Sequence, residues 1–152
     1  MSGLDFLRSL NGSWSGDNRL WLEPGKPPFA SKTAATVIHI LGGRFVRLDY
    51  TWSFDGEEQA GSYLFGYESK SELVTAAWID SWHNGERLML CRGGVGENGS
   101  VNVLGFYPAP TGPDWGWRTI IEPADSGPFR LQMYNILPTG EAFLAVEAVY
   151  HP

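Results

Sequence analysis

The feature that most constrains the fold is a series of strand-like runs, each roughly ten residues long, at even spacing along the chain. The runs are rich in aromatic and β-branched residues, which favour strands. Gly, Pro, Asn and Asp lie between them and favour turns. Such spacing is typical of a β-sandwich or a β-barrel. We count ten runs, at residues 12–23, 31–41, 44–54, 58–68, 72–83, 86–94, 100–108, 115–123, 129–138 and 141–151.

The length and composition favour a single all-β domain. The chain has 152 residues, enough to bury a hydrophobic core without metals or disulfides, and we expect one domain over residues 1–152. Its 19 Gly, 10 Pro, 7 Trp, 8 Phe and 6 Tyr are the residues that turns and strands prefer. Only residues 4–10 space their apolar side chains as a helix does, so we expect one short N-terminal helix.

Charge and cysteine content argue against several classes of function. A net charge of −6 disfavours binding to nucleic acid, which needs clustered Lys and Arg. The single cysteine, Cys91, cannot form an internal disulfide, which is typical of a reducing compartment. No apolar run has the length of a signal peptide core or of a membrane-spanning helix. We therefore expect a cytoplasmic protein without membrane insertion, and a homodimer is left open.

Two dipeptides, Asp55-Gly56 and Asn84-Gly85, favour the type I′ turn of a tight hairpin. The first predicts that Tyr50 pairs with Gly61 and that four aromatic side chains point inward, those of Tyr50, Trp52, Tyr63 and Phe65. The second predicts four further pairs: Trp78 with Cys91, Asp80 with Met89, Trp82 with Arg87 and His83 with Glu86.

The second hairpin decides how the polar side chains of residues 78–86 combine. In a regular strand Asp80 and His83 point to opposite faces, so a direct Asp–His pair requires a bulge or a distorted turn. Asp80 and Arg87 are instead diagonal neighbours and can form an ion pair. That pair is either a polar anchor in an apolar cavity or a self-satisfied pair at the barrel rim. The same face is predicted to carry Trp78, Trp82, Met89 and Cys91.

Several stretches resemble the calycin superfamily, which includes the lipocalins and the fatty-acid-binding proteins. "LNGSWSG" is similar to the Gly-x-Trp opening of these barrels, with Gly12 and Trp14 in the matching places. Together with "ILGGRFV", "GYE", "WIDSWH", "WR" and a final Pro-x-Gly hairpin, it resembles an uncharacterised bacterial family of lipocalin-like domains over nearly the whole chain. The resemblance implies a ten-stranded, up-and-down antiparallel β-barrel in which Trp14 closes one end and Arg118, or else Arg130, packs across it. A β-sandwich is the alternative.

We predict that the barrel binds a small, largely apolar molecule in its interior. A carboxylate on this molecule would favour Arg87, whereas an amine or a hydroxyl would favour Asp80. The predicted ligand-binding residues are Tyr50, Trp52, Tyr63, Phe65, Trp78, Asp80, Arg87 and Met89.

Three other functions are alternatives. An enzyme would use Asp80, His83 or Glu147 as a general acid or base. A haem protein is implied by the nitrobindins of the same superfamily, which hold haem through a histidine of a late strand; here the last run offers only His151, beside the C-terminus. An interaction module would need no pocket. We expect no other cofactor and no metal, because the histidines lack zinc-site spacing, and we expect His39 to be structural.

Overall fold

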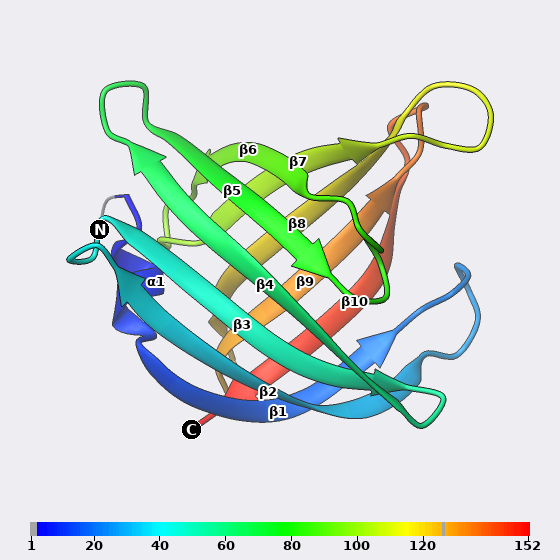
Figure 1. The fold of residues 1–152 in the computed structure, drawn as a ribbon, viewed down its shortest axis with the longest axis horizontal. Helices are drawn as coiled ribbons and strands as arrows, with labels where there is room; N and C mark the ends of the chain where they lie inside the picture. The colour runs from blue at the N-terminus through cyan, green and yellow to red at the C-terminus, as the bar shows by residue number, and fades with distance from the viewer. Residues whose placement is uncertain (1–2, 126) are drawn as a thin grey trace.

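The ten runs form ten antiparallel strands that close into a barrel (Figure 1). The computed structural model describes residues 3–125 and 127–152. Its elements are α1 (Asp5–Ser9), β1 (Gly12–Leu20), β2 (Phe29–Ile40), β3 (Phe45–Phe54), β4 (Glu57–Glu68), β5 (Leu73–Asp80), β6 (Met89–Val95), β7 (Val101–Tyr107), β8 (Trp115–Ala124), β9 (Gly127–Ile136) and β10 (Ala142–His151). Each strand pairs with its neighbours in the chain, and β1 also pairs with β10, so the sheet closes on itself. The all-β, up-and-down barrel is therefore confirmed and the sandwich is wrong.

The Asp55-Gly56 hairpin has the predicted register. Both turn residues have positive φ, +52° and +79°, as a type I′ turn requires. Tyr50 pairs with Gly61 and the ladder continues to the strand ends without a shift. The four aromatic residues predicted on the inner face are buried: Tyr50, Trp52, Tyr63 and Phe65.

The prediction of a tight hairpin at Asn84-Gly85 is wrong, because residues 81–88 form a loop between β5 and β6. Trp78 pairs with Met89 instead of Cys91, and Cys91 pairs with Ala76. The chain leaves the strand at Asp80, whose side chain accepts two backbone N–H groups of the following residues and whose carbonyl accepts the N–H of Asn84 at 3.0 Å. These bonds coil the chain and override the turn preference of the dipeptide.

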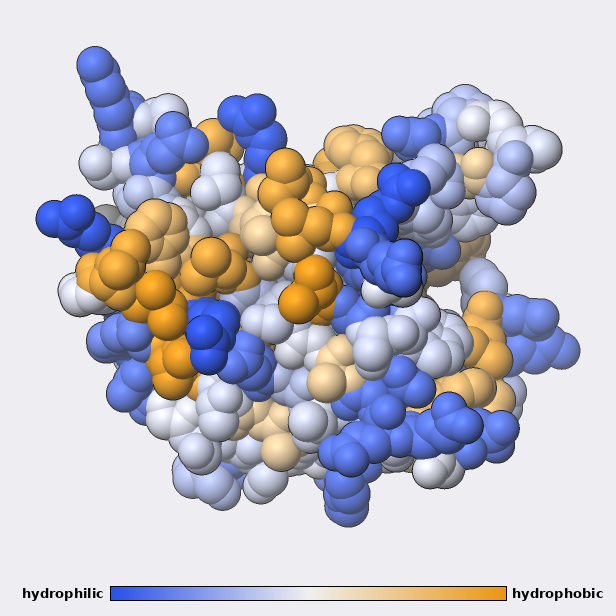
Figure 2. Space-filling view, viewed as in Figure 1, coloured by the Kyte–Doolittle hydropathy of each residue, from blue (hydrophilic) through white to orange (hydrophobic). Residues whose placement is uncertain are grey.

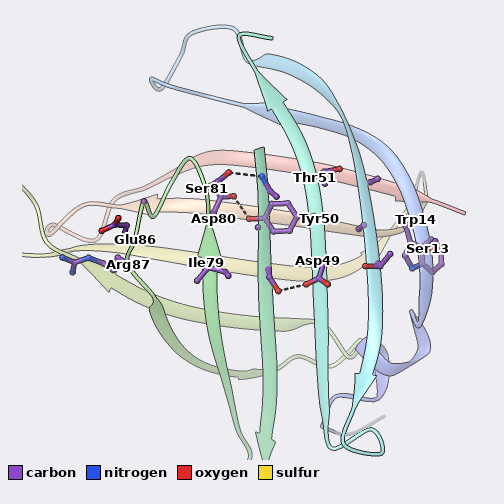
Figure 3. A pocket seen from close by; sticks show the side chains of 17 residues that line it. Ser13, Trp14, Asp49, Tyr50, Thr51, Ile79, Asp80, Ser81, Glu86 and Arg87 are labelled. Atoms are coloured by element: carbon purple, nitrogen blue, oxygen red, sulfur yellow. Dashed lines mark hydrogen bonds between the residues drawn. The ribbon is translucent and has the colours of Figure 1, made fainter. Parts of the chain in front are cut away.

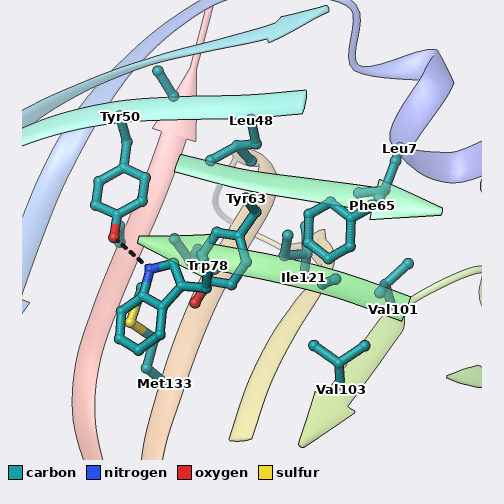
Figure 4. Packing of buried hydrophobic residues seen from close by; sticks show 14 of the residues in the cluster. Leu7, Leu48, Tyr50, Tyr63, Phe65, Trp78, Val101, Val103, Ile121 and Met133 are labelled. Carbon is teal, nitrogen blue, oxygen red and sulfur yellow. Dashed lines mark hydrogen bonds between the residues drawn. The ribbon is translucent and has the colours of Figure 1, made fainter. Parts of the chain in front are cut away.

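One end of the barrel is closed by α1, and we call this end the base. The helix buries Phe6 and Leu7 against the strands, and its flanking residues Leu4 and Leu10 are buried with them. The packed interior contains Leu7 of α1 together with the aromatic residues of β3 to β5 (Figure 4). The next hollow above this packing, between β1, β3, β5, β9 and β10, measures about 10 Å³, room for about one water molecule.

Trp14 attaches α1 to the barrel, but not as the resemblance implied. Its indole N–H donates to the carbonyl of Leu10 at 2.7 Å, and its ring packs edge-on against Phe129 at 5.3 Å. Arg118 lies on the outer face of β8 and donates to Asn102. Arg130 pairs with Glu122. The predicted arginine across Trp14 is therefore wrong, and an aromatic ring takes its place.

The end opposite α1 is open, and we call it the mouth. The loops that follow β1, β5 and β7 surround it (Figure 1). On the outer wall, hydrophobic side chains gather over the left half and centre of the view (Figure 2). Exposed hydrophobic residues of β3 to β6 include Phe45, Leu64, Ile79 and Leu90. Within the described ranges, no helix is long and apolar enough to cross a membrane.

Candidate functional site

Asp80, the last residue of β5, is the centre of a buried polar network. Its side chain is 0% exposed. Oδ2 accepts hydrogen bonds from the hydroxyl of Tyr50 at 2.6 Å and the indole of Trp52 at 3.3 Å. Oδ1 accepts the backbone N–H groups of Trp82 and His83 at 2.8 and 2.9 Å. The carboxylate thus has the donors that a buried charge requires.

These donors decide the protonation of the network. Burial alone would raise the pKa of Asp80, but hydrogen bonds from His83 and Tyr50 outweigh it and the pKa is lowered. Asp80 is therefore ionised at neutral pH. Burial and the charge of Asp80 raise the pKa of Tyr50 well above its ordinary value. The hydroxyl of Tyr50 therefore stays protonated and donates to Asp80. Its oxygen accepts the indole N–H of Trp78 at 3.0 Å.

Gly61 makes the bond between Tyr50 and Asp80 possible. The three residues form one row across β3, β4 and β5, with Gly61 paired to both neighbours. The ring of Tyr50 crosses directly over Gly61: a Cβ there would lie 2.1 Å from the tyrosine oxygen. The row holds an aromatic hydroxyl and a carboxylate two strands apart at hydrogen-bond distance, because the residue between them has no side chain.

Asp80 also contacts the ring of His83, contrary to the prediction that the two point to opposite faces. His83 Nδ1 lies 3.1 Å from Asp80 Oδ1. The coiling of the chain after β5 brings the two residues together, which is the distorted turn that such a pair requires. An ionised carboxylate has no proton to donate, so the hydrogen-bond pattern assigns the hydrogen to Nδ1. In the neutral ring, Nε2 is then an acceptor.

Four tryptophans surround the imidazole of His83. The centroids of their rings lie 4.8 Å (Trp82), 5.2 Å (Trp117), 5.6 Å (Trp52) and 5.7 Å (Trp78) from the centroid of the imidazole. The side chain of His83 is 10% exposed. Its orientation is therefore fixed by Asp80 on one side and by aromatic packing on the others.

His83 and three of these tryptophans line a cavity at the mouth, which we call the mouth cavity. Its volume is about 440 Å³, within the range of about 300 to 1,000 Å³ of small-molecule sites. Its walls are mostly aromatic and aliphatic. The lining residues are Leu20, Trp21, Leu22, Trp78, Trp82, His83, Asn84, Arg87, Met89, Tyr107, Pro108, Trp117, Asn135 and Ala145.

Three buried polar atoms around this cavity have no hydrogen-bond partner. Within residues 3–125 and 127–152, the buried side-chain atoms without a partner are His83 Nε2, Asn84 Oδ1 and Trp117 Nε1. All three belong to residues that line the mouth cavity. Unpaired buried polar atoms are costly and rare in native proteins. Their concentration beside one cavity makes that cavity the candidate site.

A larger hollow of about 790 Å³ lies on the outer wall of β1 to β5, and we call it the outer trough (Figure 3). Its lining includes outward-facing residues such as Ser13, Thr51 and Ile79, the buried Tyr50 and Asp80, and Arg87 at one end. Asp49 accepts hydrogen bonds from Arg47 and Ser62 there. The trough is a wide surface depression, and none of the three unpartnered atoms belongs to a residue that lines it. The mouth cavity is therefore the stronger candidate site.

The structure divides the predicted ligand-binding residues into three groups. Trp78, Arg87 and Met89 line the mouth cavity. Tyr50, Trp52 and Asp80 lie behind it in the hydrogen-bonded network. Tyr63 and Phe65 belong to the packed interior, where their rings stack at 5.4 Å. The predicted Asp80–Arg87 ion pair is wrong: Arg87 is exposed in the loop, and the basic side chain that contacts Asp80 among the described residues is His83.

The predicted acid–base and haem candidates other than Asp80 and His83 lie away from the mouth cavity. Glu147 is on the outer face of β10, where it binds Arg19 and Gln132. His151 is exposed at the base end of β10. His39 contacts the carbonyl of Arg8 at 3.1 Å on the surface. Among the described residues, no group of three or more His, Cys, Asp or Glu side chains is placed to hold a metal ion.

Sequence reasoning missed three features of the site. The Asp80–His83 contact has a sequence signal, since an Asp at a strand end often accepts the backbone N–H groups two and three residues later. Trp117 and Asn84 had no such signal, because their role depends on which strands and loops meet at the mouth. Cys91, predicted on the same face as Asp80, is buried, and burial raises its pKa to about 11, which favours the protonated thiol.

Residues 4–151 match a family model described as "Protein of unknown function (DUF1579)". No curated protein matches the chain.

Proposed function

This protein belongs to the DUF1579 family, and we propose that it binds a small, largely apolar molecule in the mouth cavity. The observation that carries the proposal is the set of three unpartnered buried polar atoms around one cavity. Aromatic walls with a few convergent polar groups are typical of small-molecule sites. The predicted relationship to the calycins, whose barrels include the fatty-acid-binding proteins, is in keeping with this proposal.

The packing of the interior limits where the molecule binds. Below the network of Asp80, the described interior is filled by side chains, and the hollow beside Tyr50, Trp52 and Asp80 measures about 10 Å³. The ligand therefore enters at the mouth and stops above Asp80. Trp78, Trp117 and Met89 contact its apolar surface, and Arg87 lies at the rim.

A titration with a fluorescent hydrophobic probe, 1-anilinonaphthalene-8-sulfonate, tests the proposal. We expect saturable binding that a non-fluorescent apolar compound such as naphthalene displaces. Ala145→Trp adds a large side chain to the cavity wall and should abolish binding. Thr51→Trp, in the outer trough, is the matched control and should bind as the wild type does. Non-saturable binding, or equal loss in both variants, overturns the proposal.

The contact between Asp80 and His83 favours a second candidate, an enzyme in which His83 is a general base. A carboxylate that orients a histidine, with the other ring nitrogen left for a substrate, is a frequent arrangement for proton transfer. Conversion of a bound compound that is lost in His83→Phe would support this candidate.

Haem binding stays a prediction. Hemin added to the protein should give a Soret shift that His83→Phe abolishes if the mouth cavity holds haem.

A further inference from the structure

Four large hydrophobic side chains project from the outer wall of β3 to β6, and we call them the apolar ridge: Phe45, Leu64, Ile79 and Leu90. They are between 37% and 71% exposed. Leu64 and Leu90 lie in one row across the sheet, because the residue between them, Ala77, pairs with both. Phe45 lines the same surface hollow as these two leucines. Contiguous exposed apolar side chains of this kind mark a surface that contacts another molecule.

The outer trough lies directly beside the apolar ridge. Ser62 of the trough is two residues before Leu64 on β4, and it pairs with Ile79 on β5, so the ridge and the trough share a border. Farther from the ridge, the register aligns small outward side chains of β2, β3 and β4 in one row of the trough: Ala34, Thr51 and Ala60. The outer wall therefore carries a projection and a depression side by side.

A projection beside a depression is complementary to itself. In a dimer with a two-fold axis, both copies use the same patch, and each residue pair across the interface occurs twice. An axis at the border of ridge and trough places the ridge of each copy over the trough of the other. A second copy of the chain therefore fits this wall with no further surface, whereas an unrelated partner needs a complementary surface of its own.

The size of this wall matches a dimer interface. From β1 to β6 it spans about 24 Å, and along β4 from Ala60 to Gly66 it spans about 20 Å, at the usual spacings of a sheet. The flat footprint is on the order of 500 Å², and the accessible surface is larger because side chains project from it. Stable interfaces bury about 800 Å² of accessible surface on each partner.

The two halves of the outer wall differ in charge. On β1 and β8 to β10, outward side chains form ion pairs with each other, Arg19 with Glu147 and Arg130 with Glu122. On the ridge and the central rows of the trough, the outward charges are those of Arg47 and Asp49, which pair with each other. Interface centres are depleted of charged residues. The apolar half is thus the part of the wall where two copies, each of net charge −6, repel each other least.

The charges at the margins of this half are balanced. The hollow beside the ridge is lined by Glu68 and Arg92, and the trough is lined at one end by Glu86 and Arg87. Within the described part of the chain, these four side chains form no ion pair. Each margin offers one acid and one base, so a second copy presents an opposite charge to each. Such complementarity fixes the register of two surfaces.

We propose that two copies of this chain associate through the apolar ridge and the outer trough, with the ridge of each copy seated in the trough of the other. The closed sheet leaves no strand edge for pairing between chains, so the association relies on side chains. The proposal is independent of the ligand, because Arg87 is the one residue that lines both the trough and the mouth cavity.

Sedimentation velocity at a series of concentrations tests the proposal on the full chain. Interfaces of this size have micromolar or lower dissociation constants, so we expect a dimer at about 100 μM. In Ile79→Glu a charge replaces a central ridge side chain, and the dissociation constant should rise about tenfold or more. Leu22→Glu is the matched control, because Leu22 has the same exposure of 49% but lies in the loop after β1. It should leave the dissociation constant unchanged.

A second variant tests the trough. Thr51→Trp fills the trough with a large side chain, and the resulting clash with the partner's ridge should weaken the dimer about tenfold or more. The mouth cavity is unchanged in this variant, so the hydrophobic probe should still bind there. Circular dichroism of all three variants checks that they are folded.

Three results overturn the inference. These are a wild type that stays monomeric at about 100 μM, a dimer that Ile79→Glu and Thr51→Trp leave as stable as the wild type, or an equal loss in Leu22→Glu and Ile79→Glu. In each case the proposed function stands, because the probe titration reports on the mouth cavity separately.

Discussion

Asp80 joins the packed interior to the mouth cavity, because its two oxygens serve different parts of the molecule. Oδ2 accepts from Tyr50 and Trp52 of β3, and Oδ1 accepts from the loop that carries His83. A single carboxylate thereby fixes the end of β5, the course of the following loop and the tautomer of the histidine. Substitutions at Asp80 should affect both folding stability and the site.

We expect Asp80→Asn to lower the free energy of unfolding by about 1 to 3 kcal/mol at pH 7, because a buried donor such as the indole of Trp52 then meets an amide N–H₂ group. Urea unfolding measures the change. Asp55→Asn, in the exposed turn of β3 and β4, is the matched control and should change the free energy by less than about 0.5 kcal/mol. Equal stability of Asp80→Asn and the wild type would contradict the role of the network.

The acid dependence of stability tests the charge of Asp80. Its pKa is lowered in the folded protein from a value of about 3.9 in an unfolded chain. Between the two values the unfolded state binds more protons, so stability rises with pH. The contribution of Asp80 is complete above about pH 5 and is lost as the pH falls through the lowered pKa. Urea unfolding below pH 5 should show a smaller loss in Asp80→Asn than in the wild type, and an identical loss would refute this assignment.

Gly61 offers a second test, because the row from Tyr50 to Asp80 has no room for a side chain. In Gly61→Ala the new Cβ would lie 2.1 Å from the oxygen of Tyr50, so the ring must move away from Asp80. We expect a loss of about 1 to 3 kcal/mol in the free energy of unfolding. Gly94→Ala is the control, because a Cβ at Gly94 meets nothing within 4 Å. Similar losses in both variants would show that glycine content, rather than the close approach, decides stability.

At the scale of elements, α1 depends on Trp14 for its attachment to the barrel. The indole binds the carbonyl of Leu10, the residue that follows the helix, and packs on Phe129 of β9. Trp14→Ala should cost about 3 kcal/mol, the lower end for a truncated tryptophan because the side chain is only half-buried. Thermal unfolding measures this as a lower midpoint, by about 6 to 12 °C. An unchanged midpoint would mean that α1 is held by its own leucines.

The two hairpins show why one element was predictable and the other was not. At Asp55-Gly56 the neighbouring side chains do not compete for the backbone hydrogen bonds of the turn, so the turn preference of the dipeptide decides the register. At Asn84-Gly85 the carboxylate of Asp80 takes the backbone N–H groups before the dipeptide is reached. Local sequence patterns predict register only where no side chain competes for the backbone hydrogen bonds.

At the scale of the whole molecule, the ten strands and the closed sheet were predictable because strand length and turn spacing are local properties of the chain. The mouth cavity was predictable only in part. Trp78 and Met89 follow from inward-facing positions on single strands, whereas Trp117 and His83 meet through a strand and a loop 34 residues apart in the sequence. Contacts of this kind depend on how the barrel closes.

The up-and-down order of the strands has a consequence for how such a protein can change. Every second connection lies at the mouth, and the others lie at the base with α1 (Figure 1). The segments around the proposed ligand site are therefore separate from those that seal the hydrophobic core. Mouth loops can be lengthened, shortened or exchanged while the base is left intact, which makes this barrel a scaffold whose mouth can diversify faster than its fold.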